Sequence, residues 1–201
     1  DIAWVLGAGY ERVLICDPAI NFKTSWLRLL VKTIEASDPE QRITFDAFLQ
    51  YPCLSAEQAE LLPRVRWDRL MLGLQTDDAE GLAALNRPRF VREQFERALA
   101  WVRPARTPTV DVMTGVPGDT PDKIRSRVDY LLRLGCRVAV FPLLALPGTE
   151  IWQRRQEYGL EVDERRFHLV RSLRTLPEDA YRRVVEELEG IAAGGAPLEV
   201  A

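Results

Sequence analysis

The sequence predicts an α/β fold, a partial (β/α) TIM-type barrel with parallel strands and a C-terminal helical extension. Short apolar runs rich in β-branched residues recur along the chain, and a longer stretch with helical apolar spacing follows each run. A closed eight-stranded barrel takes ~250 residues. Because the chain has 201 residues, we expect the barrel to be partial.

The first two βα units occupy the N-terminal part of the chain. The first predicted strand covers residues 12–16, and its helix begins at Thr24 or Ser25, which are good N-cap residues. The second strand lies around residues 43–45. Its helix follows Ser55, which forms a capping-box pattern with Gln58 three residues later.

Three further units follow. The third strand covers residues 70–74 and precedes a helical region at about 90–102. The fourth covers residues 110–113, and its helix opens with Thr120-Pro121, where proline suits the first helical position. The fifth covers residues 138–141 and leads into a helix around 151–158.

The pattern changes at Gly159. An arginine-rich stretch there precedes a final helix at 177–192, and we expect the last residues to fray. The sequence therefore predicts a barrel portion in residues 1–160 and an extension in residues 161–201. His168, which lies in this extension, is interpreted as a surface or packing residue.

Charge and composition narrow the classes of partner. The net charge of −3 gives no electrostatic reason to expect nucleic acid or an anionic membrane as the main partner, and small-molecule or protein partners stay open. The expected partner is a small-molecule or peptide substrate. The sequence contains neither a membrane-spanning stretch nor a signal pattern, which predicts a cytoplasmic protein. Cys16, Cys53 and Cys136 are far apart and fit neither a disulfide framework nor a zinc site.

Polar residues and glycines cluster where predicted strands end. They are Asp17, Asp46, Gln75-Thr76 and the loop Gly115-Val116-Pro117-Gly118, while Asp111 lies inside the fourth strand. The carboxyl ends of parallel strands share one face, where ligands bind. Carboxylates and amides there can accept hydrogen bonds from ribose hydroxyls, and glycines let a ligand approach the backbone. The alternative is that these residues serve only in turns and helix caps.

Several of these segments, in order, resemble motifs of radical S-adenosylmethionine (radical SAM) enzymes. Gly73-Leu74-Gln75-Thr76, with Leu82, Leu85 and Asn86-Arg87 after it, is similar to the family's Gly-x-Glu/Gln-Ser strand. Residues 112–120 resemble the strand that ends in Gly-Leu-Pro-Gly-Glu/Asp-Thr, and residues 140–150 the next strand with its Pro-Gly-Thr turn. Residues 17–22 resemble a segment found especially in cobalamin-linked members.

The resemblance covers roughly residues 11–160 and implies that the five strands are barrel strands two to six. It implies that S-adenosylmethionine binds across their ends, with Asp46 and Gln75 as ribose or methionine contacts. Arg87 would grip the methionyl carboxylate, although a helix-surface salt bridge is equally open. The other residues implied to face or shape the cofactor site are Asp17, Thr76, Asp111, Gly115, Pro117, Gly118 and the backbone around Leu143 and Leu144.

The family's 4Fe–4S cluster is held by a Cys-x-x-x-Cys-x-x-Cys loop, and no two cysteines here are close in sequence. We expect either that an upstream segment carries the cluster, because the sequence opens as though in mid-domain, or that the chain is a degenerate relative. The expected cofactors are S-adenosylmethionine and, in the full-length protein, the cluster, with cobalamin as an open alternative. An electron-donor protein is a further expected partner.

Three functions stay open. In the first, the chain is part of a radical SAM enzyme and is inactive alone. In the second, it is a cluster-less binding or scaffold module. In the third, an unrelated barrel enzyme uses Asp46, Asp111 or Asp119 as acid or base, but the sequence has no phosphate loop, nucleophile motif or metal-ligand spacing to support it.

Overall fold

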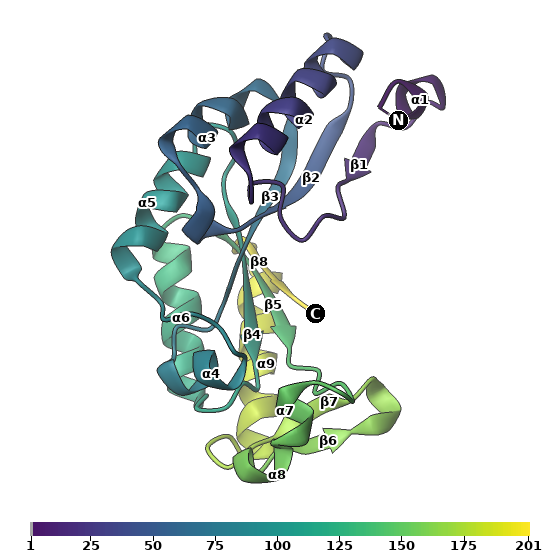
Figure 1. Ribbon diagram of the computed structural model, residues 1–201. Coiled ribbons are helices and arrows are strands. Elements are labelled where there is room, and N and C mark those ends of the chain that lie inside the picture. Colours follow the sequence, from purple (N-terminus) through teal and green to yellow (C-terminus); the bar gives the residue numbers. More distant parts are fainter. Residues whose placement is uncertain (1) are drawn as a thin grey trace. The chain divides into compact units, whose positions relative to one another are not determined.

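A computed structural model describes residues 2–201 (Figure 1). Its strands are β1 (Arg12–Leu14), β2 (Thr44–Leu49), β3 (Trp67–Gln75), β4 (Thr109–Thr114), β5 (Arg137–Pro142), β6 (Glu161–Asp163), β7 (Leu169–Ser172) and β8 (Leu198–Val200). Its α-helices are α1 (Ile2–Gly7), α2 (Thr24–Ser37), α3 (Ala56–Leu61), α4 (Ala79–Ala84), α5 (Arg92–Val102), α6 (Pro121–Arg133), α7 (Glu150–Gln153), α8 (Arg155–Tyr158) and α9 (Glu178–Ala193). Short 3₁₀ turns occupy Tyr51–Cys53, Leu62–Arg64 and Glu164–Arg166.

Within residues 2–201 the main sheet has six strands in the order β1-β2-β3-β4-β5-β8. The pairs β1–β2, β2–β3 and β5–β8 are parallel. Strands β6 and β7 form a separate antiparallel pair. A parallel sheet whose strands alternate with helices confirms the predicted α/β class.

The chain divides into two compact units. Unit 1 extends to Gly73 and includes Val91–Thr109, and unit 2 comprises Leu74–Phe90 and Val110–Ala201. The division expected between residues 160 and 161 stays a prediction.

In unit 1, helices α2, α3 and α5 pack together beside the strands (Figure 1). Helix α2 buries Leu27, Val31 and Ile34, which recur at helical spacing and form its apolar face. Ser55 caps α3, because its hydroxyl oxygen accepts a hydrogen bond from the Gln58 amide at 3.3 Å. Only the Ser55 half of the predicted capping box forms, because the Gln58 side chain donates to the Asn21 carbonyl and the Thr24 hydroxyl and its Oε1 accepts no hydrogen bond within residues 2–201.

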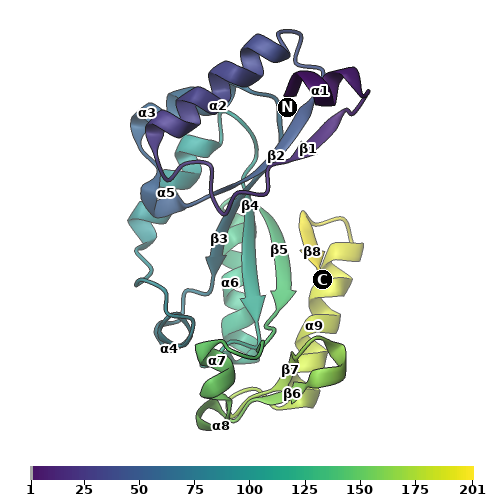
Figure 2. The same cartoon turned by 45° about the vertical axis from the view of Figure 1, so that its right-hand side comes forward.

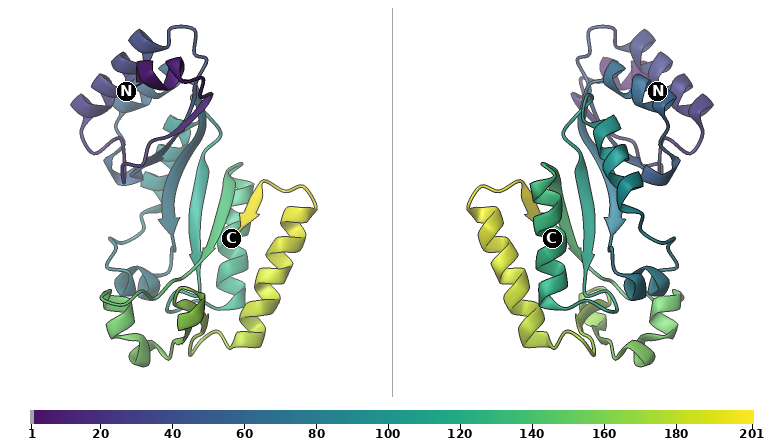
Figure 3. Two further views of the ribbon diagram at one scale, coloured as in Figure 1. Left: turned by 90° about the vertical axis from the view of Figure 1, so that its right-hand side faces the viewer. Right: turned by 90° about the vertical axis from the view of Figure 1, so that its left-hand side faces the viewer.

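In unit 2, α6 packs on β5 and α9 packs on β8, and the two helices lie side by side (Figure 3). Thr120 caps α6 by accepting a hydrogen bond from the Lys123 amide at 3.3 Å, and Pro121 takes the first helical position. The arrows of β4 and β5 point toward the same end, where α7, α8 and the β6–β7 pair lie (Figure 2). That end carries most of the predicted site residues.

Two expectations about chain ends and boundaries were wrong. The first strand ends at Leu14, so Cys16 and Asp17 follow in a loop. The C-terminal residues do not fray, because Leu198–Val200 pairs in parallel with β5 and the Ala201 amide donates to the Val140 carbonyl at 2.9 Å. The open edge of β5 gives this segment backbone partners that its own sequence cannot supply.

No helix within residues 2–201 has the length and apolar character needed to span a membrane. The cytoplasmic location stays a prediction.

Candidate functional site

Strand β3 ends at Gln75, one residue beyond the predicted strand at 70–74, and the chain turns there. Gln75 has a left-handed backbone with φ of 65°, which is uncommon outside glycine. The next side chain, Thr76, is fully buried and its hydroxyl accepts a hydrogen bond from the Asp78 amide at 3.2 Å. Gln75 is partly exposed at the strand end. Thr76, by contrast, is buried within the protein.

The glycine loop after β4 is shaped by contacts within unit 2. Gly115 and Gly118 have φ of 77° and 85°. A Cβ at Gly115 would lie 3.0 Å from the Tyr181 hydroxyl oxygen, and one at Gly118 would lie 2.5 Å from the Asp78 Oδ1. These two glycines and Pro117 between them are buried, so the chain's own packing explains why glycine stands at both positions.

The aspartate of this loop, Asp119, has a structural role. Its side chain is fully buried, and its two oxygens accept hydrogen bonds from the Val116 amide at 3.1 Å and from Arg127 Nη2 at 3.0 Å. Burial raises the pKa of Asp119, and the charge and hydrogen bond of Arg127 oppose that rise. A carboxylate so enclosed has no access to a substrate, which argues against an acid or base role for it.

Asp111 is the third residue of β4, inside the strand as predicted, and is 8% exposed. Arg87 follows α4, and its amide donates to the Leu82 carbonyl at 2.8 Å. Its side chain is exposed and forms no salt bridge with any residue in 2–201. The surface salt bridge that was the alternative for Arg87 is therefore not formed within the described chain.

The two leucines expected near adenine, Leu143 and Leu144, have different environments in the segment after β5. The Leu143 amide donates to the Thr114 carbonyl at 2.8 Å, and the Leu143 carbonyl accepts from the Val170 amide at 3.0 Å. Leu144 differs, because its side chain is 40% exposed and its backbone N–H and C=O have no hydrogen bond to any residue in 2–201. Leu144 is the residue that offers an open backbone edge and an apolar wall.

The expected place of Asp46 at the end of the second strand was wrong. Strand β2 continues to Leu49, because the residues after Asp46 keep pairing with β3. Asp46 is 2% exposed, and its Oδ2 accepts from Arg12 Nη2 at 2.6 Å and Arg69 Nη2 at 3.3 Å. In unit 1 this carboxylate pairs with two guanidinium groups, of which Arg12 also pairs with Asp68, a role that the sequence interpretation did not include.

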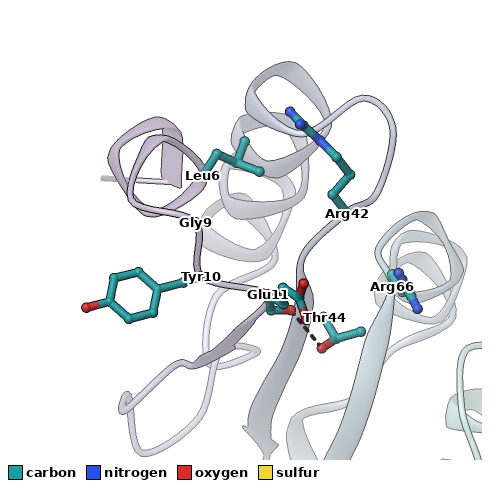
Figure 4. A pocket seen from close by; sticks show the side chains of 7 residues that line it. All are labelled: Leu6, Gly9, Tyr10, Glu11, Arg42, Thr44 and Arg66. Carbon is teal, nitrogen blue, oxygen red and sulfur yellow. Dashed lines mark hydrogen bonds between the residues drawn. The ribbon is translucent and has the colours of Figure 1, made fainter.

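Unit 1 also has a cavity that the sequence did not predict (Figure 4). Its volume is about 560 Å³, and it is lined by Leu6, Gly9, Tyr10, Glu11, Arg42, Thr44 and Arg66. The Tyr10 side chain turns away from the two arginines. Thr44 begins β2 and Arg66 immediately precedes β3, so the cavity lies at the amino ends of these strands. Predicted site residues are absent from its lining.

The sequence interpretation missed Arg127. Its side chain is 1% exposed and its Nε donates to Asp77 Oδ1 at 2.8 Å. The signal that could have identified it is its position in the helical repeat. Arg127 recurs with Ile124, Val128 and Leu131 on the buried face of α6. A charged residue at such a position must have partners of opposite charge.

The residues present do not fit a 4Fe–4S cluster. Cys16 and Cys53 are exposed in unit 1, and Cys136 is buried in unit 2. Three His, Cys, Asp or Glu side chains placed to hold a metal ion do not occur together in the part of the chain that the structure describes. These three cysteines therefore do not supply the neighbouring thiolates that hold such a cluster.

Comparison with solved structures shows the fold. The radical S-adenosylmethionine methyltransferase TsrM from Kitasatospora setae, with cobalamin and a 4Fe–4S cluster bound, matches with TM-score 0.62 and 20% identity over 79% of this chain and 33% of its own. Coproporphyrinogen III oxidase (HemN) from Escherichia coli, a radical SAM enzyme, matches with TM-score 0.61 and 16% identity over 86% of this chain and 37% of its own.

The archaeal Elp3 from Methanocaldococcus infernus matches with TM-score 0.63 and 12% identity over 100% of this chain and 50% of its own. The chain thus spans between a third and half of these proteins, and the likeness confirms a partial TIM-type barrel.

None of the curated proteins matches the sequence. The sequence model of the Radical SAM superfamily matches residues 12–131, which is more than half of the chain. The chain therefore belongs to the radical SAM superfamily.

Proposed function

We propose that the chain binds S-adenosylmethionine at the carboxyl ends of β3, β4 and β5 in unit 2, as the cofactor-binding part of a radical SAM enzyme. The observation that carries this proposal is Leu144, two residues after the end of β5, with an exposed side chain and a backbone N–H and C=O that form no hydrogen bond within residues 2–201. Adenine needs an apolar wall and a backbone donor and acceptor, and Leu144 offers both.

Other residues of unit 2 suit the remaining groups of the ligand. Gln75 at the end of β3 has an amide that can bond ribose hydroxyls. The Arg87 side chain, exposed and without an ion pair in residues 2–201, can grip the methionyl carboxylate with two parallel hydrogen bonds. Asp111, in β4, is proposed to face the cofactor.

The cluster would have to be held by cysteines other than Cys16, Cys53 and Cys136, on another segment of the full protein. In the family, that cluster supplies the electron for cleaving S-adenosylmethionine. The radical chemistry, a small-molecule or peptide substrate and an electron-donor protein are parts of the proposal that rest on the family alone. A cobalamin-linked type is an open part of the proposal that rests on the resemblance of residues 17–22.

Calorimetric titration of the chain with S-adenosylmethionine tests the proposal. We expect saturable binding, and Leu144→Asp should weaken it at least about tenfold, because a carboxylate replaces the apolar wall. Leu146→Asp is the matched control, since Leu146 is 45% exposed two residues further on and should bind as the parent chain does. Absence of heat at millimolar ligand would contradict the proposal.

A second experiment separates an enzyme from a cluster-less scaffold. The full-length gene product would be reconstituted anaerobically with iron and sulfide and assayed for 5′-deoxyadenosine. Formation of this product supports the enzyme. Binding of S-adenosylmethionine without 5′-deoxyadenosine, in a protein that also takes up no iron, favours the scaffold.

A further inference from the structure

Arg127 joins three separate backbone segments of unit 2 through one guanidinium group. Nη2 donates to Asp119 Oδ1 at 3.0 Å, Nε donates to Asp77 Oδ1 at 2.8 Å, and Nη1 donates to the Met113 carbonyl at 3.3 Å. Asp77 lies two residues after Gln75, and Asp119 directly follows Gly118. The group therefore ties the loop after β3 to the loop after β4.

This arrangement is costly unless it is fully paired. The side chains of Arg127 and Asp119 are 1% and 0% exposed, so both charges have left water. A buried ion pair adds little stability compared with apolar side chains of the same volume. The fork of an arginine, however, fixes the geometry of two carboxylates at once, which a lysine or an apolar side chain cannot do.

A second cation, one turn earlier on α6, bridges the same two loops. Lys123 Nζ lies 2.5 Å from Asp78 Oδ2 and donates to the Gly118 carbonyl at 2.9 Å. Because Lys123 and Arg127 are four residues apart, they project from the same face of the helix. Two independent links from one helix therefore hold the loop after β3 against the loop after β4.

We infer that Arg127 is a positioning residue that holds the Gln75 end of β3 in register with the loop 115–119. The inference rests on the proposed function for its effect on S-adenosylmethionine, but not for its effect on the loops. Arg127 itself touches no ligand, because its side chain is enclosed. It acts through Asp77 on the backbone that carries Gln75.

Asp77→Ala tests the link with the least disturbance. Asp77 is the more exposed of the two carboxylates, at 36%, and its removal leaves the buried Arg127–Asp119 pair intact. We expect faster hydrogen–deuterium exchange at residues 75–78. The dissociation constant for S-adenosylmethionine should rise about tenfold, because binding must then order a loop that the parent chain already holds in place. Asp122→Ala is the control, because it breaks the 3.0 Å pair with Arg125 on the same helix and leaves every hydrogen bond of Arg127 and Lys123 to the two loops in place.

Arg127→Lys provides the second variant, since a lysine keeps the charge beside Asp119 but replaces the planar fork, whose spaced donors reach Asp77 and Asp119 together, with a single compact ammonium. The double variant Asp77→Ala/Arg127→Lys should bind no more weakly than the weaker single variant, because both remove the same link. A merely structural role would lower stability without changing affinity at low temperature. Additive losses in the double variant, or unchanged exchange at residues 75–78 in Asp77→Ala, would overturn the inference.

Different results would contradict S-adenosylmethionine binding by the chain and loop positioning by Arg127. If the parent chain does not bind S-adenosylmethionine, the proposed function fails, and exchange at residues 75–78 still decides whether Arg127 positions the loop. If the parent chain binds and Asp77→Ala binds equally well, the positioning inference fails and the proposed function stands.

Discussion

The hydroxyl oxygen of Tyr181 lies 2.8 Å from the hydroxyl oxygen of Thr114. Thr114 is the last residue of β4, and Tyr181 is a buried residue of α9. A Cβ on the next residue, Gly115, would lie 3.0 Å from the same phenolic oxygen. The C-terminal helix therefore supports the glycine loop of the candidate site from within unit 2, in addition to extending the chain beyond the barrel strands.

This contact predicts a loss of stability in alkali. Burial raises the pKa of Tyr181 to about 12, although its hydrogen bond with Thr114 opposes the rise. Between the unfolded pKa of about 10 and this value, the unfolded chain loses the phenolic proton and the folded chain keeps it. Stability should therefore fall as pH rises through this window, by on the order of 2 kcal/mol.

Tyr181→Phe should lack this alkaline loss and should be about 1 kcal/mol less stable at neutral pH, because it has no hydrogen bond to Thr114. Urea denaturation of both proteins at pH 7, 9 and 11 measures the two effects. Parallel loss of stability in both proteins above pH 10 would show that another group titrates.

Gly118→Ala should be clearly more destabilising than Gly148→Ala. Both glycines have left-handed φ values, 85° and 89°, so both substitutions carry a backbone strain of about 1 kcal/mol. At position 118 the new Cβ would meet Asp78 Oδ1 at 2.5 Å, whereas at position 148 it would have no atom of the described residues within 4 Å. Thermal denaturation of the two variants gives the comparison, and equal losses would argue against a tight contact with Asp78.

Asp78→Ala should cost about 1 kcal/mol at pH 7, because Asp78 caps α4 through the Glu80 and Gly81 amides. Burial acts to raise the pKa of Asp78, but bonds from Lys123 and from these amides lower it overall. Its contribution is therefore present above the unfolded pKa of about 4 and is lost as pH falls through the lowered value. The parent chain and the variant should converge in stability in strong acid, and a gap that persists there would contradict the assignment.

Asp46→Ala should reduce stability by about 2 kcal/mol, because Arg12 and Arg69 would lose their shared carboxylate. We expect its affinity for S-adenosylmethionine at low temperature to match that of the parent chain. Calorimetric titration of the folded variant measures this. A folded variant with lost affinity would instead support the ribose or methionine contact that the family resemblance implies.

The fold was largely predictable because its signals are local. Each strand from β1 to β5 is an apolar run that a helix follows, and caps such as Ser55 and Thr120 are visible in the sequence. Strand β8 was missed because three residues carry no periodic signal, and its partner β5 lies about sixty residues earlier.

The site was predictable only in part, for a related reason. Gln75 and the glycines 115 and 118 lie in the turns that their sequence motifs indicate. The ion pairs of Asp46 depend on the pairing of β2 with β1 and β3, which places Arg12 and Arg69 beside it. The links of Arg127 likewise depend on tertiary packing, so residue order alone does not show which carboxylates it meets.

The ends of β3, β4 and β5 in unit 2 are proposed to form a binding surface for S-adenosylmethionine. Hydrogen–deuterium exchange of the 201-residue chain with and without saturating S-adenosylmethionine tests it most directly. We predict protection at residues 75–76, 115–118 and 143–144. Protection confined to the cavity of Tyr10, Arg42 and Arg66, or none at all, would contradict it.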